Sequence, residues 1–180
     1  MHKQQSPWRR RAVPLAAFLA GWLLGFLLWA GGTPPNVVCG ALNTTYQVGG
    51  LILSFADGHN VFQYAPGAQA ALWTYIDRIP VRGQLSQGVV GAAVVLKQVT
   101  NQGDESYYIA VAVLENGKIR GSNALPLGEN LTVTAVDVAD EMVWVHSVQF
   151  RPDASGRLAP GAVQVERFIW EAGKLIKAGA

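Results

Sequence analysis

The chain has 180 residues and a formal net charge of +2, and half of its residues are hydrophobic. Four of its 14 basic residues precede position 12, whereas residues 33–180 hold ten basic and twelve acidic residues. A surface that binds nucleic acid needs a basic patch, so this composition excludes nucleic acid as an expected partner.

The first 30 residues predict a membrane anchor. Arg9–Arg11 are followed by an uncharged, largely apolar run from Ala12 to Ala30. As a helix this run spans about 28 Å, close to the ~30 Å hydrocarbon core of a bilayer. Because positive residues stay on the cytoplasmic side, we expect residues 1–11 to be a cytoplasmic tail and residues 12–30 a single-pass transmembrane helix. Everything from Thr33 onward then lies outside the cytoplasm.

The apolar run is open to a second interpretation, as the core of a signal peptide. Its length exceeds the usual 7–15 residues of such a core, but small residues at Ala30–Gly32 offer a cleavage site. Cleavage near Gly32 would give a secreted protein. A third hypothesis anchors the chain by a lipid on Cys39, although the residues before it, Asn36–Val38, do not fit a lipidation signal.

Cys39 is the sole cysteine, so an internal disulfide is excluded and an intermolecular one is the alternative to a free thiol. Residues 31–40, rich in Gly and Pro, are expected to be a linker with little to bury. Residues 41–180 are enough for one compact extracytoplasmic domain that buries its own core.

The first half of this domain reads mostly as strands. Leu51–Ala56 precedes Asp57-Gly58, a hairpin signal, and a strand begins again at Val61. Ala68–Ile76 fits either a short helix or an irregular strand. Ala92–Val99 is a continuous apolar run of strand length, which predicts a central strand covered on both faces.

The second half has the same character. Ser106–Leu114 runs into Asn116-Gly117, the strongest short-range hairpin signal in the chain. Further strands are predicted at Leu131–Ala135 and Val143–Phe150, paired across Ala139–Glu141, and at Gln164–Trp170, with a loop over Pro152–Pro160. The expected fold is mainly β: a single twisted, mostly antiparallel sheet of about eight strands.

Five segments together resemble a family of exported bacterial β-rich domains for which no reaction is known. Its members read Leu-Asn-Ala-Thr-Tyr, Asp-Ala-Ala-Val-Val-Leu, Phe-Tyr-Tyr-Leu, Leu-Gly-Asp-Arg-Val and Tyr-x-x-x-x-Gly-x-Leu in this order. The resemblance covers nearly all of residues 41–180 and implies an extracytoplasmic domain, often tethered to a membrane. The matching segments are Leu42–Tyr46, Ala92–Leu96, Tyr107–Ala110, Leu127–Leu131 and Phe168–Leu175.

The chain departs from this family at one loop. Family members carry an acidic, calcium-like loop before the Ala-Ala-Val-Val-Leu strand, whereas Arg82–Gly91 contains no carboxylate. Calcium takes six to eight oxygen ligands, usually with several carboxylates among them. We therefore predict no calcium site there.

Few residues suggest a catalytic or metal-binding role. His59 and His146 are far apart in sequence and form no metal-ligand pattern, so we expect no metal, no cofactor and no structural zinc. No nucleophile elbow surrounds Ser86, which we interpret as a turn residue. Asp137, Asp140 and Glu141 cluster around one turn and are the candidate acids of a hydrolase, or simply solvated acids at a hairpin tip.

Aromatic residues permit two interpretations, a stacking surface for glycans or peptides and ordinary packing within a sheet. The six residues are Trp73, Tyr75, Tyr107, Tyr108, Trp144 and Trp170.

The sequence thus predicts a non-catalytic binding or scaffolding domain, anchored in the cell membrane, with an envelope protein or a glycan as partner. No residue is assigned to catalysis, and the ligand-binding residues stay open. The alternative function is a hydrolase of cell-envelope polymers.

Overall fold

The computed structural model describes residues 36–63 and 71–179, and within them the chain is mainly β. The strand ladders are antiparallel, which confirms this part of the predicted fold. The prediction of a single sheet of about eight strands was wrong, because the described residues hold thirteen strands in three sheets of two, four and seven strands. The elements are α2 (Val37–Ala41), β1 (Thr45–Val48), β2 (Leu51–Ser54), β3 (His59–Gln63), β4 (Ala71–Ile76), β5 (Val81–Ser86), β6 (Val89–Thr100), β7 (Glu105–Glu115), β8 (Lys118–Gly121), β9 (Leu125–Glu129), β10 (Leu131–Ala139), β11 (Met142–Pro152), β12 (Leu158–Glu171) and β13 (Lys174–Lys177).

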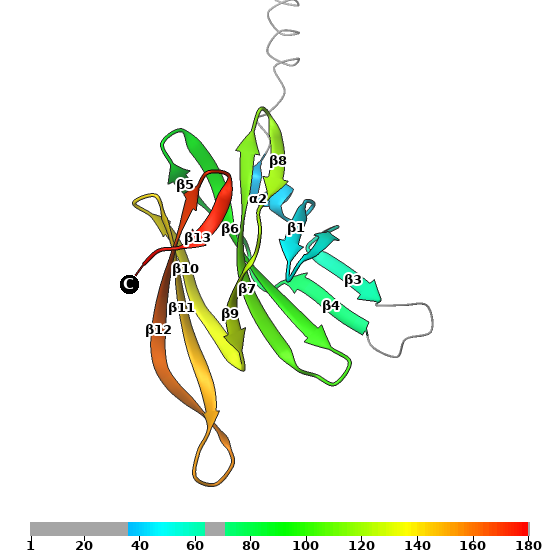
Figure 1. Ribbon diagram of the computed structural model, residues 1–180, viewed down its shortest axis with the longest axis vertical. Coiled ribbons are helices and arrows are strands. Elements are labelled where there is room, and N and C mark those ends of the chain that lie inside the picture. Colours follow the sequence, from blue (N-terminus) through cyan, green and yellow to red (C-terminus); the bar gives the residue numbers. More distant parts are fainter. Residues whose placement is uncertain (1–35, 64–70, 180) are drawn as a thin grey trace, which may run out of the picture. The chain divides into compact units, whose positions relative to one another are not determined.

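The seven-stranded sheet is built on β6 and β7, its two longest strands (Figure 1). Two short strands, β4 and β5, lie end to end along the free edge of β6, and β8 and β9 do the same along β7. Pro80 separates β4 from β5, since proline has no N–H to donate to a ladder. This arrangement explains the wrong strand count, because each short strand reads in sequence as part of a turn-rich connection.

The four-stranded sheet follows chain order, β10-β11-β12-β13. Its first hairpin pairs Leu131 with Gln149 and Ala139 with Met142, which confirms the predicted pairing of these two strands. The β1–β2 hairpin is a separate sheet, and a parallel bridge between Gln47 and Asn123 connects it to the segment that joins β8 to β9.

The central stretches of β6 and β7, residues 91–96 and 109–113, are buried on both faces, as the continuous apolar run that begins at Ala92 predicts. One face packs against the four-stranded sheet, and its buried cluster includes Val95, Ile109 and Phe168. The other face packs against α2 and the β1–β2 hairpin, and its cluster includes Val94, Leu96 and Tyr46. The core is therefore two apolar layers on either side of one central strand pair.

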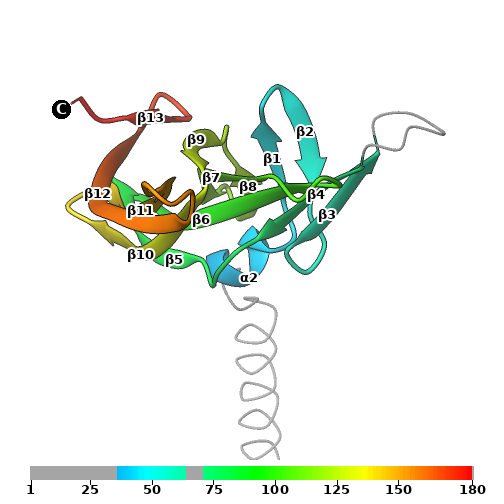
Figure 2. The ribbon, with the colours of Figure 1, turned by 90° about the horizontal axis from the view of Figure 1, so that it is seen from below.

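Residues 37–41 form a helix where the sequence predicts a linker. Asn36 caps this helix by accepting a hydrogen bond from the N–H of Val38 at 3.0 Å. Val37 and Ala41 are buried, and α2 lies against β6 and β7. Figure 2 shows α2 beside the large sheet. The spacing of four residues between Val37 and Ala41 places both on one face of the helix, so this segment belongs to the folded domain.

Three turns refine the sequence prediction. Asn116-Gly117 has two positive φ angles, 50° and 73°, and closes the β7–β8 hairpin as predicted. Asp57-Gly58 also turns tightly, but it closes only the Ala56–His59 bridge, because β2 pairs with β1 and β3 pairs with β4. The loop predicted over Pro152–Pro160 is shorter, since β12 already begins at Leu158. Residues 71–76 are strand rather than helix.

Within residues 36–63 and 71–179, no helix has both the length and the apolar character needed to cross a membrane. The predicted anchor at residues 12–30 lies outside these residues, as do the cytoplasmic tail and the cleavage site near Gly32.

Candidate functional site

The three acids considered for a hydrolase lie on and beside the turn between β10 and β11. Asp140 and Glu141 occupy this turn with positive φ angles of 52° and 61°, and all three carboxylates are exposed. Glu141 accepts a hydrogen bond from the amide of Gln84 at 3.3 Å. Asp137 pairs across the ladder with Trp144. Two surface hollows lie elsewhere on the domain, and none of these three acids lines either of them. The acids are therefore not brought together around an enclosed space.

The other residues considered for chemistry lie apart from one another. His59 is exposed at the start of β3, and His146 is half-buried on β11 opposite Val165. Ser86 ends β5 in the β5–β6 hairpin, and the thiol of Cys39 is free and exposed on α2. In the part of the chain that the structure describes, no three His, Cys, Asp or Glu side chains come together as a potential metal site.

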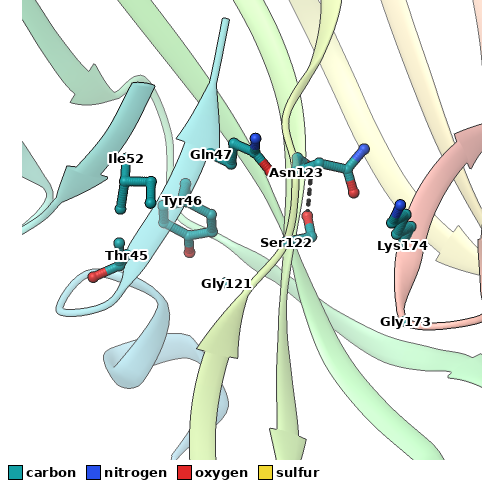
Figure 3. Close-up of a pocket in the computed structure, with 9 residues that line it drawn as sticks. All are labelled: Thr45, Tyr46, Gln47, Ile52, Gly121, Ser122, Asn123, Gly173 and Lys174. Atoms are coloured by element: carbon teal, nitrogen blue, oxygen red, sulfur yellow. Dashed lines mark hydrogen bonds between the residues drawn. The ribbon is translucent and has the colours of Figure 1, made fainter. Parts of the chain in front are cut away.

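A hollow of about 300 Å³ opens where the β1–β2 hairpin, the end of β8 and the β12–β13 turn meet (Figure 3). Ile52, which is 75% exposed, stands at its edge, and a second hollow of about 140 Å³ lies between β11 and β12. The residues lining the larger hollow are Thr45, Tyr46, Gln47, Ile52, Gly121, Ser122, Asn123, Gly173 and Lys174.

The polar groups of the larger hollow mostly hold the fold together. The side chain of Asn123 donates to the carbonyl of Leu175 and accepts from its N–H, both at 2.9 Å. Ser122 accepts from the N–H of Val111 and donates to the carbonyl of Asn123. The hydroxyl of Tyr46 donates to the carbonyl of Ala41 at 2.8 Å, and burial raises its pKa. These bonds tie β1 to α2 and β13 to the connection between β8 and β9. Thr45, Gln47 and Lys174 are the lining residues whose polar side chains take no part in them.

A second candidate site lies on the face of the large sheet where β3, β4, β6 and β7 extend together. Cross-strand neighbours in an antiparallel ladder point to the same side of the sheet. The register aligns His59, Tyr75, Lys97 and Tyr107 in one row. The adjacent row on the same side aligns Trp73, Val99 and Glu105. We call these seven residues the wing face.

Lys97 is the electrostatic centre of the wing face. Its Nζ lies 2.6 Å from Oε1 of Glu105, 5.2 Å from the ring centroid of Tyr107 and 6.0 Å from that of Tyr75. Burial lowers the pKa of Lys97, but its hydrogen bonds with Glu105, Tyr107 and Tyr75 outweigh burial and hold the pKa above its ordinary value. Lys97 is therefore a fixed cation, and not a candidate nucleophile.

The phenol of Tyr107 completes this network by donating to Oε2 of Glu105 at 3.2 Å. Burial raises the pKa of Tyr107, and its interaction with Lys97 opposes the rise. Next to this network, Trp73 leaves 40% of its surface exposed. An exposed indole beside a paired lysine and carboxylate can stack against a ligand, whereas proton transfer would require titratable groups that converge in an enclosed space.

The six aromatics of the sequence do not form one surface. Trp73, Tyr75 and Tyr107 share the wing face, whereas Tyr108 packs against the opposite cluster. Trp144 lies on the four-stranded sheet with the guanidinium of Arg167 5.6 Å from its ring centroid, and Trp170 packs against the other buried cluster. Among these six, only Trp73 is exposed, and Tyr107 is 5% exposed and packs within the buried cluster between the two larger sheets. Trp73 is therefore the aromatic whose position suits stacking against a ligand, and Tyr107 has a packing role.

Sequence reasoning did not identify Lys97, Val99 or Glu105 as site residues. The signal for them was the two-residue spacing between Lys97 and Val99 and between Glu105 and Tyr107, which places each pair on one side of its strand. To connect these pairs with Trp73, one must also know which strands are neighbours and in which register they pair.

Comparison of the chain with protein-family models, with curated proteins and with solved structures gave no match in any of the three searches. The resemblance to exported bacterial β-rich domains therefore stays a prediction, and function is inferred from the geometry of this chain.

Proposed function

We propose that the chain is a membrane-anchored extracytoplasmic binding domain without catalytic activity, and that its ligand contacts the wing face. The observation that carries the proposal is the exposed indole of Trp73 on a sheet face whose charged groups are already paired. Membrane attachment and export are inferred from the Arg9–Arg11 cluster and the apolar run at residues 12–30.

The wing face suits binding better than hydrolysis. A hydrolase of envelope polymers needs convergent titratable groups in a concave site. Asp137, Asp140 and Glu141 lie at an exposed hairpin end, and the larger hollow offers Lys174 as its one ionisable group besides the buried, hydrogen-bonded Tyr46. No observation in the described residues favours the hydrolase.

Protease treatment of intact cells that express the full chain tests the anchor. We expect a membrane-bound protein of 19.3 kDa that is digested from outside while a short N-terminal fragment is protected. Intact-mass measurement separates the alternatives, since a lipid on Cys39 adds mass and cleavage near Gly32 removes residues 1–32. A chain that is protected in intact cells and digested only after lysis would contradict export.

Photo-crosslinking in the same cells tests binding at the wing face. With a photoreactive phenylalanine in place of Trp73, we expect an adduct that is absent when the same group replaces Ile79. Ile79 is the matched control, because it is 82% exposed and lies outside the wing face. Equal adducts at both positions, or none at position 73, would contradict a ligand on this face.

A further inference from the structure

We propose that the wing face binds an uncharged saccharide chain. In this arrangement the indole of Trp73 stacks on one sugar ring, and the carboxylate of Glu105 accepts a hydrogen bond from a hydroxyl of the next. The inference rests on the proposed binding function and assigns its ligand class.

The spacing of the Trp73 row fits two consecutive sugar rings. Trp73 pairs with Val99, and Val99 pairs with Glu105, so the indole and the carboxylate are two strands apart. Two strand spacings are about 10 Å, which is close to the length of a disaccharide. Between them lies the half-buried isopropyl group of Val99, an apolar support for the C–H face of a sugar. Apolar contact in the middle and hydrogen bonding at one end match the two-sided chemistry of a pyranose.

The charges of the wing face favour an uncharged ligand. The side chain of Lys97 is 14% exposed, and its ammonium interacts with Glu105 and two tyrosines, so it has little left to offer an anion. A carboxylate has two oxygens with about four acceptor positions. Lys97 uses Oε1 of Glu105 and Tyr107 uses Oε2, one contact each. Glu105 keeps 41% of its side chain exposed and can accept further hydroxyl donors.

The network beneath Glu105 holds the carboxylate in place before a ligand arrives. Two partners on two neighbouring strands fix it, Lys97 on β6 and Tyr107 on β7. A fixed acceptor loses little side-chain entropy on binding, which favours a ligand whose hydroxyls have set positions. An acidic polymer would instead need unpaired cations, and an added peptide strand would need a free sheet edge rather than a face.

Titration of the purified full chain with cellotetraose and chitotetraose tests this inference. The chain is kept in a detergent without a sugar head group, and binding is measured by calorimetry. We expect saturable binding of at least one of the two oligosaccharides. We expect Trp73→Ala to weaken it about tenfold or more, Trp73→Tyr to restore part of it, and Ile79→Ala, an exposed apolar control outside the wing face, to leave it unchanged.

Three outcomes would overturn the saccharide assignment. These are no binding of either oligosaccharide by the unaltered chain, equal binding by Trp73→Ala, and tighter binding of an anionic chain such as hyaluronate. The proposed binding function is judged separately by the crosslink at position 73. A protein adduct there together with no oligosaccharide binding would reject the sugar and keep the binding face.

Discussion

We expect replacement of Phe168 by alanine to lower the free energy of unfolding by about 3–5 kcal/mol. Phe168 has no exposed surface and belongs to the buried cluster between the large sheet and the four-stranded sheet. It pairs with Val143 in the β11–β12 ladder, so its ring points into this layer together with the side chain of Val143. Truncation leaves a cavity that two packed sheets cannot close by moving a single side chain.

Urea denaturation of the full chain, followed by near-ultraviolet circular dichroism, measures this loss. Val165→Ala is the matched control, because Val165 lies on the same strand and is 49% exposed. Its cost should stay within about 0.5 kcal/mol. Equal losses for the two variants would mean that the four-stranded sheet does not depend on the layer around Phe168.

The second large effect is expected at Gly121, where replacement by alanine should cost about 2–3 kcal/mol and release the β1–β2 hairpin. A Cβ atom at this position would overlap the carbonyl oxygen of Thr45 and lie 2.7 Å from Cδ1 of Tyr46. The carbonyl of Thr45 belongs to the backbone and cannot rotate away like a side chain, and Tyr46 is fully buried. The hairpin would have to move away, which breaks the bonds from Gln47 to Ser122 and from Ala124 to Gln47.

Amide hydrogen exchange is the measurement suited to this variant, because it separates local release from global unfolding. Relative to the unaltered chain, we expect Gly121→Ala to speed amide exchange in residues 45–54 more than in β6 and β7. Gly179→Ala serves as control, since nothing lies within 4 Å of a Cβ added there. Unchanged protection of residues 45–54 would show that the hairpin tolerates the added methyl group.

The wing face shows where a single sequence reaches its limit. Trp73 and Tyr75 could be recognised as aromatic strand residues, but both stacking and packing remained open for them. The exposure of each ring bears on this choice, and exposure depends on which strands cover the face. Lys97 and Glu105 belong to no sequence motif, because their ion pair arises from the β6–β7 register and not from local spacing.

The fold was predictable to the extent that its signals are local. Alternation and apolar runs identified the strands, and Asn116-Gly117 identified its hairpin, because a two-residue type I′ turn needs positive φ at both positions. The Asp57-Gly58 signal was equally local, yet its flanking strands pair elsewhere. A turn sets the direction of the chain, whereas pairing over a whole strand depends on competing partners.

Residue types along the chain were enough to predict the mainly β class, a central strand over Ala92–Val99 and the exclusion of an internal disulfide. The anchor at residues 12–30 stays a prediction. The folded chain was needed to show that the thirteen strands of the described residues form three sheets, that α2 belongs to the domain and that Trp73, Val99 and Glu105 share one row. Ladder register and burial are set by contacts between residues far apart in sequence, which no local pattern encodes.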